Sequence, residues 1–205
     1  QEGVKAACAD CTIISNYVGV TPDAWNDPAR AKELASTQNA QGADIIFAAA
    51  GASGNGVIDF VNETQCFVPR GAVRDTPLDA QLANIPVSAA YSAACGADAK
   101  PLFFIGVDSN QNPRGDTDGD PATLNHGLSS MLKRVDVASY TAAMDIVNGT
   151  FTGGVQNLGL AEAGVDFALD EYNQALIPAG LIDAVNSIKQ QIIDGEITVT
   201  DYRAL

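Results

Sequence analysis

The sequence predicts an α/β fold with a mainly parallel sheet, and three observations support this prediction. Short apolar runs alternate with longer helical patterns along the chain, the order that parallel strands and their crossover helices require. Two of these runs, residues 44–50 and 102–108, have the length and composition of buried strands. The chain has 205 residues and 46% hydrophobic content, which suffices for one large core or two small lobes.

The first half of the chain alternates helices and strands. The predicted elements are the end of a helix over residues 3–9, a strand over 11–18, a helix over 29–41, a strand over 44–50 and a helix over 57–62. Asp27 is the expected N-cap of the second of these helices, and Pro28 takes its first position, where the missing N–H costs nothing. Gly42 ends this helix.

The second half continues the pattern after a proline-rich stretch. Residues 63–101 have weak periodicity and are predicted to be an insertion clamped by a disulfide. The elements predicted after it are a strand over 102–108, a helix from residue 128 that Gly149 ends, a strand over 155–160, a helix that Pro178 opens and that ends near Gly195, and a short strand over 197–199.

The net charge of the chain excludes one class of partner. The formal charge is −14, from 25 acidic and 11 basic residues. Such a surface repels phosphate backbones and anionic lipid headgroups, so we expect no nucleic-acid binding. No apolar run reaches the 18 residues of a transmembrane helix, and no signal peptide or initiator Met is present. We therefore expect that a segment has been removed upstream.

Four cysteines indicate a disulfide-permissive compartment. Cys8 and Cys11 form a Cys-x-x-Cys, which suits a local disulfide, a redox dithiol or half of a zinc site. The zinc site lacks ligands, because His126 is the single histidine. The favoured prediction is two structural disulfides, Cys8–Cys11 and Cys66–Cys95, although the sequence allows three pairings.

The glycine-rich turn after residues 44–50 does not match a cofactor motif. Gly51, Gly54 and Gly56 have the spacing Gly-x-x-Gly-x-Gly, which differs from the G-x-G-x-x-G of dinucleotide-binding folds, and a Walker lysine is missing. We therefore expect no nucleotide cofactor. The turn instead indicates a loop where the backbone comes close to a ligand or to another segment.

An acidic turn is the one candidate metal site. Asp116, Asp118 and Asp120 alternate like the opening of a calcium loop. An EF-hand needs Gly at its sixth position and Glu at its twelfth, where this chain has Pro121 and Gly127. A solvated acidic turn is the preferred interpretation, and a cation site is the alternative.

Four segments in order carry a resemblance to a known family. They are Trp25-Asn26-Asp27-Pro28 with the Lys32-Glu33-Leu34-Ala35 that follows, residues 42–51, residues 105–111 and residues 128–136. Together they resemble the basic membrane protein (BMP) family of substrate-binding lipoproteins, whose best-known members are purine-nucleoside receptors. The similarity covers most of residues 3–199 outside the insertion at about 63–101.

The resemblance implies a type I periplasmic-binding-protein fold, in which two Rossmann-like lobes close over a ligand at a hinge. It implies that this chain is the carboxyl-terminal portion of such a protein, with the amino-terminal lobe largely missing. Residues 1–124 are then most of the second lobe, and residues 125–205 return to the first lobe and the hinge. It also implies an extracytoplasmic protein with a lipid anchor on the missing part, and the membrane subunits of an ABC transporter as partners.

The resemblance also assigns ligand contacts. The residues that match the family's site are Trp25, Phe47, Gly51, Ala52, Ser53, Gly54, Asp108 and Lys133. Phe47 resembles the aromatic that stacks on a nucleobase, and Asp108 and Lys133 resemble the carboxylate and the lysine that bind the ribose. Ala52 stands where the family commonly has Gly.

Each of these residues also has a structural interpretation. Phe47 suits a core position, Asp108 a turn, Lys133 the surface of a helix, and Trp25 the packing of the lobe. The leading functional prediction is a nucleoside-binding protein without catalysis. A sensor or surface-interaction protein on the same fold, and an enzyme acting on nucleosides or sugars, are the alternatives.

Overall fold

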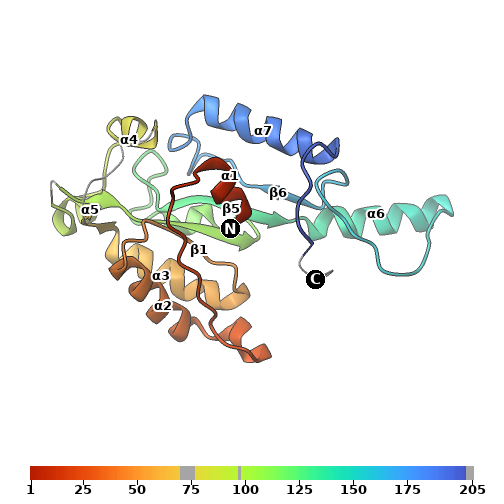
Figure 1. Ribbon diagram of the computed structural model, residues 1–205, viewed down its shortest axis with the longest axis horizontal. Helices are drawn as coiled ribbons and strands as arrows, with labels where there is room; N and C mark the ends of the chain where they lie inside the picture. Colours follow the sequence, from red (N-terminus) through yellow and green to blue (C-terminus); the bar gives the residue numbers. More distant parts are fainter. Residues whose placement is uncertain (70–76, 97, 202–205) are drawn as a thin grey trace.

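The computed structural model describes residues 1–69, 77–96 and 98–201. Among these residues, four strands form a sheet in the order β1 (Ile45–Phe47), β4 (Phe103–Asp108), β5 (Gly127–Lys133) and β6 (Val165–Phe167). The first three strands are parallel, and β6 runs antiparallel to β5 at the edge (Figure 1). The predicted α/β class is confirmed.

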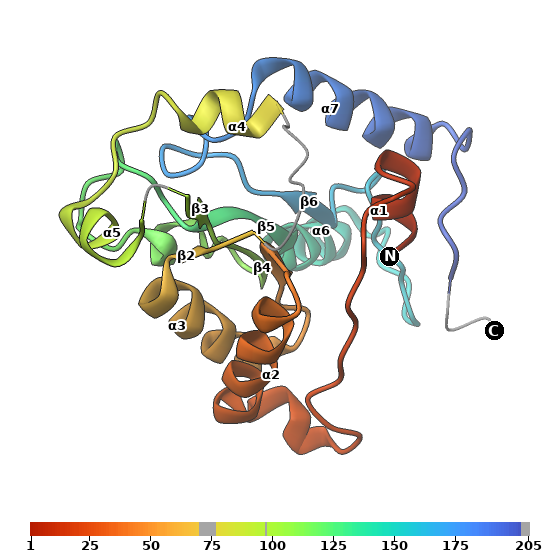
Figure 2. The ribbon, with the colours of Figure 1, turned by 60° about the vertical axis from the view of Figure 1, so that its left-hand side comes forward.

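Helices cover both faces of this sheet. The helices of the described residues are α1 (Glu2–Ala7), η1 (Pro22–Asn26), α2 (Pro28–Ala40), η2 (Gly51–Ser53), α3 (Gly54–Thr64), α4 (Pro77–Leu82), α5 (Ala89–Ala94), η3 (Asn112–Gly115), α6 (Val135–Asn148) and α7 (Ala179–Ile193). In Figure 1, α2 and α3 lie below the sheet and α7 lies above it, and Figure 2 shows the same layers after rotation. The sheet is thus the middle layer of a compact body.

The face of the sheet toward α2 and α3 holds the larger core. Ile46 and Ala48 point into it from β1 and the residue after it, and Phe104 points into it from β4. The helices supply small side chains, Ala31 and Ala35 of α2, and these let α3 approach closely. All five side chains are at most 5% exposed. Alternation along β1 decides which residues reach this core.

The opposite face is shared between α7 and the insertion. Phe103 and Leu124 are buried there, and Leu82 of α4 and Tyr91 of α5 pack against them. The strands β2 (Cys66–Phe67) and β3 (Lys100–Pro101) form an antiparallel pair at the base of the insertion. Residues 70–76 and 97 of the predicted insertion lie outside the described residues. The insertion therefore contributes to the core.

Both predicted disulfides are confirmed. Cys8 is bonded to Cys11, directly after α1. Cys66 is bonded to Cys95, which joins β2 to the end of α5 and clamps the insertion as expected. The described part of the chain has no free cysteine.

The capping predictions are confirmed as well. The side chain of Asp27 accepts a hydrogen bond from Arg30 N at 2.9 Å, and Pro28 is the first residue of α2. Gly149 follows α6 with a φ of 71°, the left-handed conformation that glycine adopts most readily. Pro178 directly precedes α7.

Three predicted strands are wrong, and the reason is the same in each case. The segments 11–18, 155–160 and 197–199 are not strands. Each exposes a side chain widely, with Tyr17 at 85%, Val155 at 95% and Val199 at 61%. β-rich composition does not make a strand without a neighbouring strand to pair with and a face to bury.

The fourth correction concerns the helix predicted from residue 128. Residues 127–133 are the strand β5, which pairs with β4 on one side and β6 on the other, and the helix begins only at Val135. The helical pattern of residues 135–148 does not extend upstream to residue 128, so the predicted start of the helix is wrong. Lys133 therefore lies at the end of a strand and not on a helix.

The sheet also continues across residue 124, where a lobe boundary was expected. β5, β6 and α7 complete the same body as β1 and β4. In contrast, α6 has no buried residue and extends beyond the end of the sheet (Figure 1). In the described part of the chain, no helix has the length and apolar character needed to cross a membrane.

Candidate functional site

The candidate site lies at one edge of the sheet, where three parallel strands end. β1, β4 and β5 run in the same direction, so the residues that follow Phe47, Asp108 and Lys133 meet at the same edge. In open α/β sheets this carboxyl-terminal edge is where ligands bind. The topology thus brings the strand ends that carry Phe47, Asp108 and Lys133 to one edge.

Asp108 and Lys133 form an ion pair at this edge. Lys133 Nζ lies 2.5 Å from Asp108 Oδ1, and the two side chains keep 61% and 46% of their accessible surface. An exposed pair of this kind contributes at most about 1 kcal/mol to stability. The pair is therefore a small contributor to the fold, and it keeps a carboxylate and an ammonium group accessible beside each other.

The backbone at Asp108 is in an unusual conformation. Its φ is +69°, and Ser109 N donates to Val107 O at 2.9 Å, which closes a γ-turn around Asp108. The γ-turn with positive φ is rare and strained, and a non-glycine residue in the left-handed region costs on the order of 1 kcal/mol. Strained residues of this kind cluster at functional sites.

The loop after β1 is built around Ser53. Its side chain is 0% exposed, and its hydroxyl donates to Ala24 O and accepts from Asp27 N, both at 2.7 Å. Ser53 therefore fastens η1 to the glycine-rich loop. Of its predicted neighbours in the site, Gly54 is buried, Gly51 is half-buried and Ala52 is exposed.

Trp25 stands beside this loop. Gly51 has a φ of +55°, and a Cβ added to it would lie 3.3 Å from Trp25 Cε3. The indole is 62% exposed and lines a hollow of about 390 Å³, together with Tyr17 and with Ala49 and Ala50 after β1. Tyr17 was not predicted as a site residue because its segment was interpreted as a strand. The signal that could have indicated a ligand contact is its aromatic side chain, which lies near Trp25 and the glycine-rich loop.

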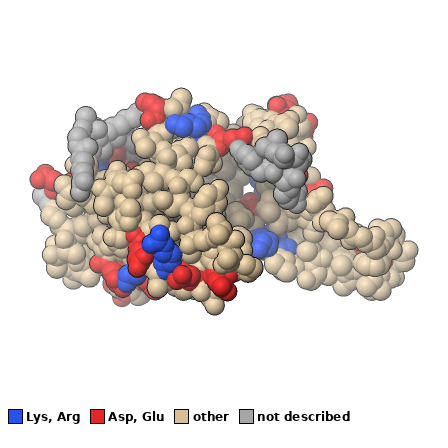
Figure 3. All heavy atoms as spheres, turned by 60° about the horizontal axis from the view of Figure 1, so that its bottom comes forward, with Lys and Arg blue, Asp and Glu red and all other residues tan. Residues whose placement is uncertain are grey.

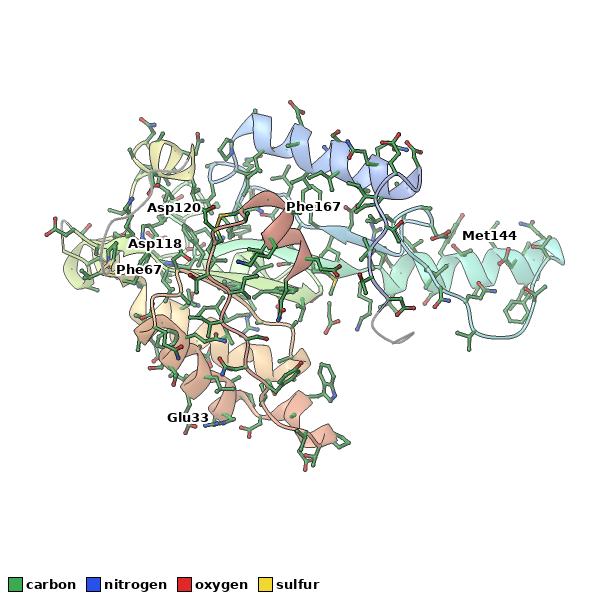
Figure 4. All side chains as sticks on the ribbon, in the orientation of Figure 1. Glu33, Phe67, Asp118, Asp120, Met144 and Phe167 are labelled. Carbon is green, nitrogen blue, oxygen red and sulfur yellow. A yellow bond between two sulfur atoms is a disulfide. The ribbon has the colours of Figure 1, made fainter. Side chains whose placement is uncertain are left out.

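Phe47 lies in a different hollow. It points from β1 to the face opposite Ile46 and lines a largely apolar space of about 430 Å³ beneath α7. Ile105, its partner in the parallel register, and Phe167 of β6 line the same space (Figure 4 labels Phe167). The structure does not bring Phe47 and Trp25 into one hollow, and a stacking role for Phe47 stays a prediction.

The acidic turn uses its carboxylates on its own backbone. Asp116 Oδ1 accepts from Asp118 N and Gly119 N, Asp118 Oδ1 accepts from Asp120 N, and Asp120 Oδ1 accepts from Ala122 N. Figure 4 labels Asp118 and Asp120 in this turn. Within the described ranges, no group of three or more His, Cys, Asp or Glu side chains is placed to hold a metal ion. The carboxylates are thus engaged within the turn, and the choice between a solvated turn and a cation site stays a prediction.

Charged side chains are unevenly distributed over the surface. Two exposed ion pairs, Arg30–Glu33 and Lys32–Glu63, lie on α2 and between α2 and α3. In Figure 3, Lys and Arg gather with Asp and Glu at the bottom of the compact body, while the part that projects to the right is mostly uncharged. On this face, the α2–α3 layer thus carries more charged side chains than the region that extends beyond the sheet.

Comparison with solved structures identifies the class of fold. The chain matches a solute-binding protein of an ABC transporter system from Aeropyrum pernix with a TM-score of 0.60 and 24% identity, over 98% of this chain and 52% of that one. A second solute-binding protein, from Conexibacter woesei, matches with a TM-score of 0.61 and 15% identity, over 97% of this chain and 50% of that one. The fold is that of a periplasmic solute-binding protein.

Sequence comparison shows similarity to one family of such proteins. Residues 1–67 match the family model described as Bmp, ABC transporter substrate-binding protein PnrA-like. The CD4+ T-cell-stimulating antigen of Listeria monocytogenes is 29% identical over 204 residues, and the nucleoside-binding protein BmpA of Lactococcus lactis is 27% identical over 199 residues. These matches cover 97% and 96% of this chain and 46% of each relative, so the chain spans about half the length of the curated relatives it matches. The resemblance to the BMP family is confirmed.

Proposed function

We propose that this chain supplies one lobe of a two-lobed solute-binding protein for an ABC importer, with a nucleoside or a similar ribose-bearing molecule as ligand. The observation that carries the proposal is the exposed Asp108–Lys133 ion pair at the carboxyl edge of the sheet. The name of the Lactococcus lactis relative, a nucleoside-binding protein, supports the choice of ligand.

The chemistry of the pair suits a vicinal diol. A carboxylate with two oxygens accepts hydrogen bonds from two neighbouring hydroxyls, and such charge-assisted bonds are about twice as strong as neutral ones. Lys133 donates to a sugar oxygen and offsets the cost of covering the negative charge of Asp108 when the ligand excludes water. Trp25, exposed beside the Gly51 loop, offers an aromatic face for the apolar part of the ligand.

The exposed surface of α6 supports the proposal of a second lobe. The chain spans about half the length of its relatives, and α6 begins directly after β5 and Arg134 without burying a residue. Tyr140, Ile146 and Val147 are between 64% and 77% exposed on it. We assign α6 and the coil after it, not the whole of residues 125–205, as the segment that crosses to another lobe. Ligand binding between lobes would then shift an open–closed equilibrium.

The location follows from the same proposal. Two disulfides suit an oxidising, extracytoplasmic compartment, and a solute-binding protein must reach the membrane subunits of its transporter there. An alternative on the same fold is a ligand sensor or a surface-interaction protein, for which the exposed apolar α6 is the supporting observation.

Calorimetry of the complete gene product tests the function. Adenosine, guanosine, inosine, uridine and ribose are titrated, and each mixture is analysed for products. The proposal expects micromolar or tighter binding of at least one nucleoside without turnover. Binding of no nucleoside would overturn the ligand assignment, and conversion of a nucleoside would overturn the binding-protein assignment.

Single variants test the site. Asp108→Ala removes the acceptor of two hydrogen bonds and should weaken nucleoside binding by about 2–4 kcal/mol, on the order of 30- to 1000-fold. Glu33→Ala is the matched control, because it removes an exposed carboxylate from an ion pair on α2, far from the sheet edge. Equal affinities of the two variants would show that Asp108 does not contact the ligand.

A further inference from the structure

We infer that a polar network in the segment after β4, on β5 and in the loop after β6, with Ser130 and Asn112 buried within it, holds Asp108 in its strained turn. Ser130 and Gln111 are then positioning residues for the Asp108 carboxylate that binds the ligand. The inference rests on the proposed function, because it gives Asp108 the role of ligand acceptor. It explains how a strained residue persists at an exposed edge of the sheet.

The first contact is made by Gln111, which folds back over β4. Its Oε1 accepts a hydrogen bond from Val107 N at 3.0 Å. The side chain passes directly over Gly106, where an added Cβ would lie 2.6 Å from Gln111 Oε1 and 2.8 Å from Gln111 Cβ. A residue with a side chain at position 106 would displace Gln111, so the glycine is required for this contact.

The second contact is made by Ser130 in the middle of β5. Its Oγ accepts from Gln111 N at 2.9 Å and donates to Asn112 Oδ1 at 2.8 Å. Ser130 and Asn112 are both 0% exposed. Ser130 pairs with Gly106 in the register of the sheet. The segment after Asp108 is therefore fixed to the strand that ends in Lys133.

The third contact comes from Asp170, after β6. Its Oδ2 accepts from Asn110 Nδ2 at 2.5 Å and from Asn112 Nδ2 at 3.2 Å. Asp170 is held in turn, because its N donates to Asn173 Oδ1 at 2.8 Å and Asn173 is 0% exposed. Residues 110 and 112 are thereby anchored to a segment about sixty positions further along the chain.

The three contacts enclose the γ-turn. Val107 is bound by Gln111 on one side of Asp108, and residues 110–112 are bound by Ser130 and Asp170 on the other. Because both flanks are fixed, Asp108 cannot relax to an extended conformation without breaking these hydrogen bonds. Leaving a buried group such as Ser130 or Asn112 unpaired costs about 1–3 kcal/mol, which is comparable to or larger than the strain of one left-handed residue.

This arrangement has a consequence for binding. A carboxylate that is already oriented loses little conformational freedom when the ligand arrives, so its hydrogen bonds contribute more to affinity. The network should therefore control how strongly the protein prefers a ligand with a diol over one without it. A network that only stabilises the fold would leave that preference unchanged.

The experiment compares Ser130→Ala and Gln111→Met with Ser129→Ala in the complete gene product. Ser129 is the matched control, because it is a neighbouring serine on β5 whose Oγ donates to Ala168 O at 2.9 Å, on the side of β6, and not to residues 109–112. Each variant is titrated with a nucleoside and with its 2′,3′-dideoxy analogue. Ser130→Ala and Gln111→Met should reduce the preference for the diol by about tenfold, with little change for the analogue. Ser129→Ala should keep the wild-type preference.

Crystal structures of the same three variants give a readout that needs no ligand. In Ser130→Ala or Gln111→Met, Asp108 should leave the left-handed region, and in Ser129→Ala it should remain there. If no nucleoside binds the wild-type protein, the proposed function fails, and the backbone of Asp108 alone still decides whether the network holds the turn. Retention of the φ of Asp108 in both network variants would overturn the inference. An equal loss of affinity for the nucleoside and its analogue would overturn the role in binding.

Discussion

Two regions that follow each other in the chain differ sharply in how they are held. β5 ends at Lys133 and α6 begins at Val135. β5 is paired on both sides, and its residues Gly127 and Ser130 are buried. No residue of α6 is buried, although its sequence is mostly apolar. The strand has both of its pairing partners within this chain, whereas the helix presents an apolar surface of the kind that marks a partner site.

The difference shows which contacts a single lobe can supply by itself. The sheet, its two helix layers and the polar network beside Asp108 draw their partners from the described residues alone. Against the described residues, none of the apolar side chains of α6 is buried, and their burial would need another surface. Perturbing each region separately should therefore affect either the stability of this chain or the properties of the complete gene product.

The largest effect is expected in the compact region, for Gly56→Ala. A Cβ at this position would lie 1.8 Å from Pro28 O, a backbone atom that cannot move without separating α3 from α2. We expect a loss of at least about 4 kcal/mol in the free energy of unfolding, or failure to fold. Gly180→Ala in α7 is the control, since nothing lies within 4 Å of the added Cβ and helix propensity favours alanine. Similar denaturant midpoints for the two variants would contradict the packing argument.

The two disulfides should differ in their contributions. Cys66–Cys95 closes a loop with a sequence separation of 29, and loop-closure entropy gives it a contribution of about 3.5 kcal/mol to the unfolding free energy. Cys8–Cys11, with a separation of 3, should contribute about 2 kcal/mol or less. Denaturant titration of the Cys66→Ala/Cys95→Ala and Cys8→Ala/Cys11→Ala variants measures both. A larger loss from the second pair would show that the insertion is dispensable for the compact region.

Variants of α6 should affect the unfolding free energy differently in this chain and in the complete gene product. Tyr140→Ser/Val147→Ser should change the unfolding free energy of this chain by less than about 0.5 kcal/mol, because both side chains are exposed. In the complete gene product the same change should cost about 2 kcal/mol or more if α6 is buried against another lobe. Val20→Ser, at a fully exposed position outside α6, is the control in both proteins. No difference between the two proteins would remove the argument for a docked α6.

The pH dependence of stability should involve His126. The ring is 1% exposed, and burial lowers its pKa from the usual 6.5, although the hydrogen bond between Nδ1 and Leu102 O opposes this shift. The unfolded chain then binds a proton more readily than the folded one below about pH 6.5. The stability is present above that pH and is lost as the pH falls below it, with a slope of at most about 1.4 kcal/mol per pH unit. Denaturant unfolding at several pH values measures the slope, and an equal slope in His126→Gln would exclude this residue as its origin.

The smallest effect is expected at the base of α6, for Asp136. Hydrogen bonds from the Arg134 guanidinium lower the pKa of this carboxyl from 3.8 to about 2, with Arg134 Nη2 at 2.8 Å from Asp136 Oδ2. An NMR titration of the carboxyl carbon should follow this midpoint, and it should return toward 3.8 in Arg134→Gln. Because the pair is exposed, we expect no measurable change in stability from the substitution. An unaltered midpoint in Arg134→Gln would show that another group sets the pKa.

The features that depend on residues close together in the chain could be predicted from the sequence. Asp27 and Pro28 start α2, Gly149 ends α6, and the apolar run of β4 forms a buried strand, because caps and buried strands are specified within a few residues. The family resemblance also predicted Asp108 and Lys133 as contacts of the same ligand; the two side chains form an ion pair, and their role toward a ligand stays a prediction.

The tertiary structure decided what depends on distant partners. Residues 127–133 are a strand because β4 and β6 pair with them, and residues 11–18 are not a strand because none pairs with them. Ser53 points inward to the backbone of η1, and Phe47 and Trp25 line separate hollows. The network that joins Gln111, Ser130 and Asp170 spans about sixty residues. Hydrogen bonds across such separations exist only once the sheet has brought their donors and acceptors together, so no local pattern in the sequence could indicate them.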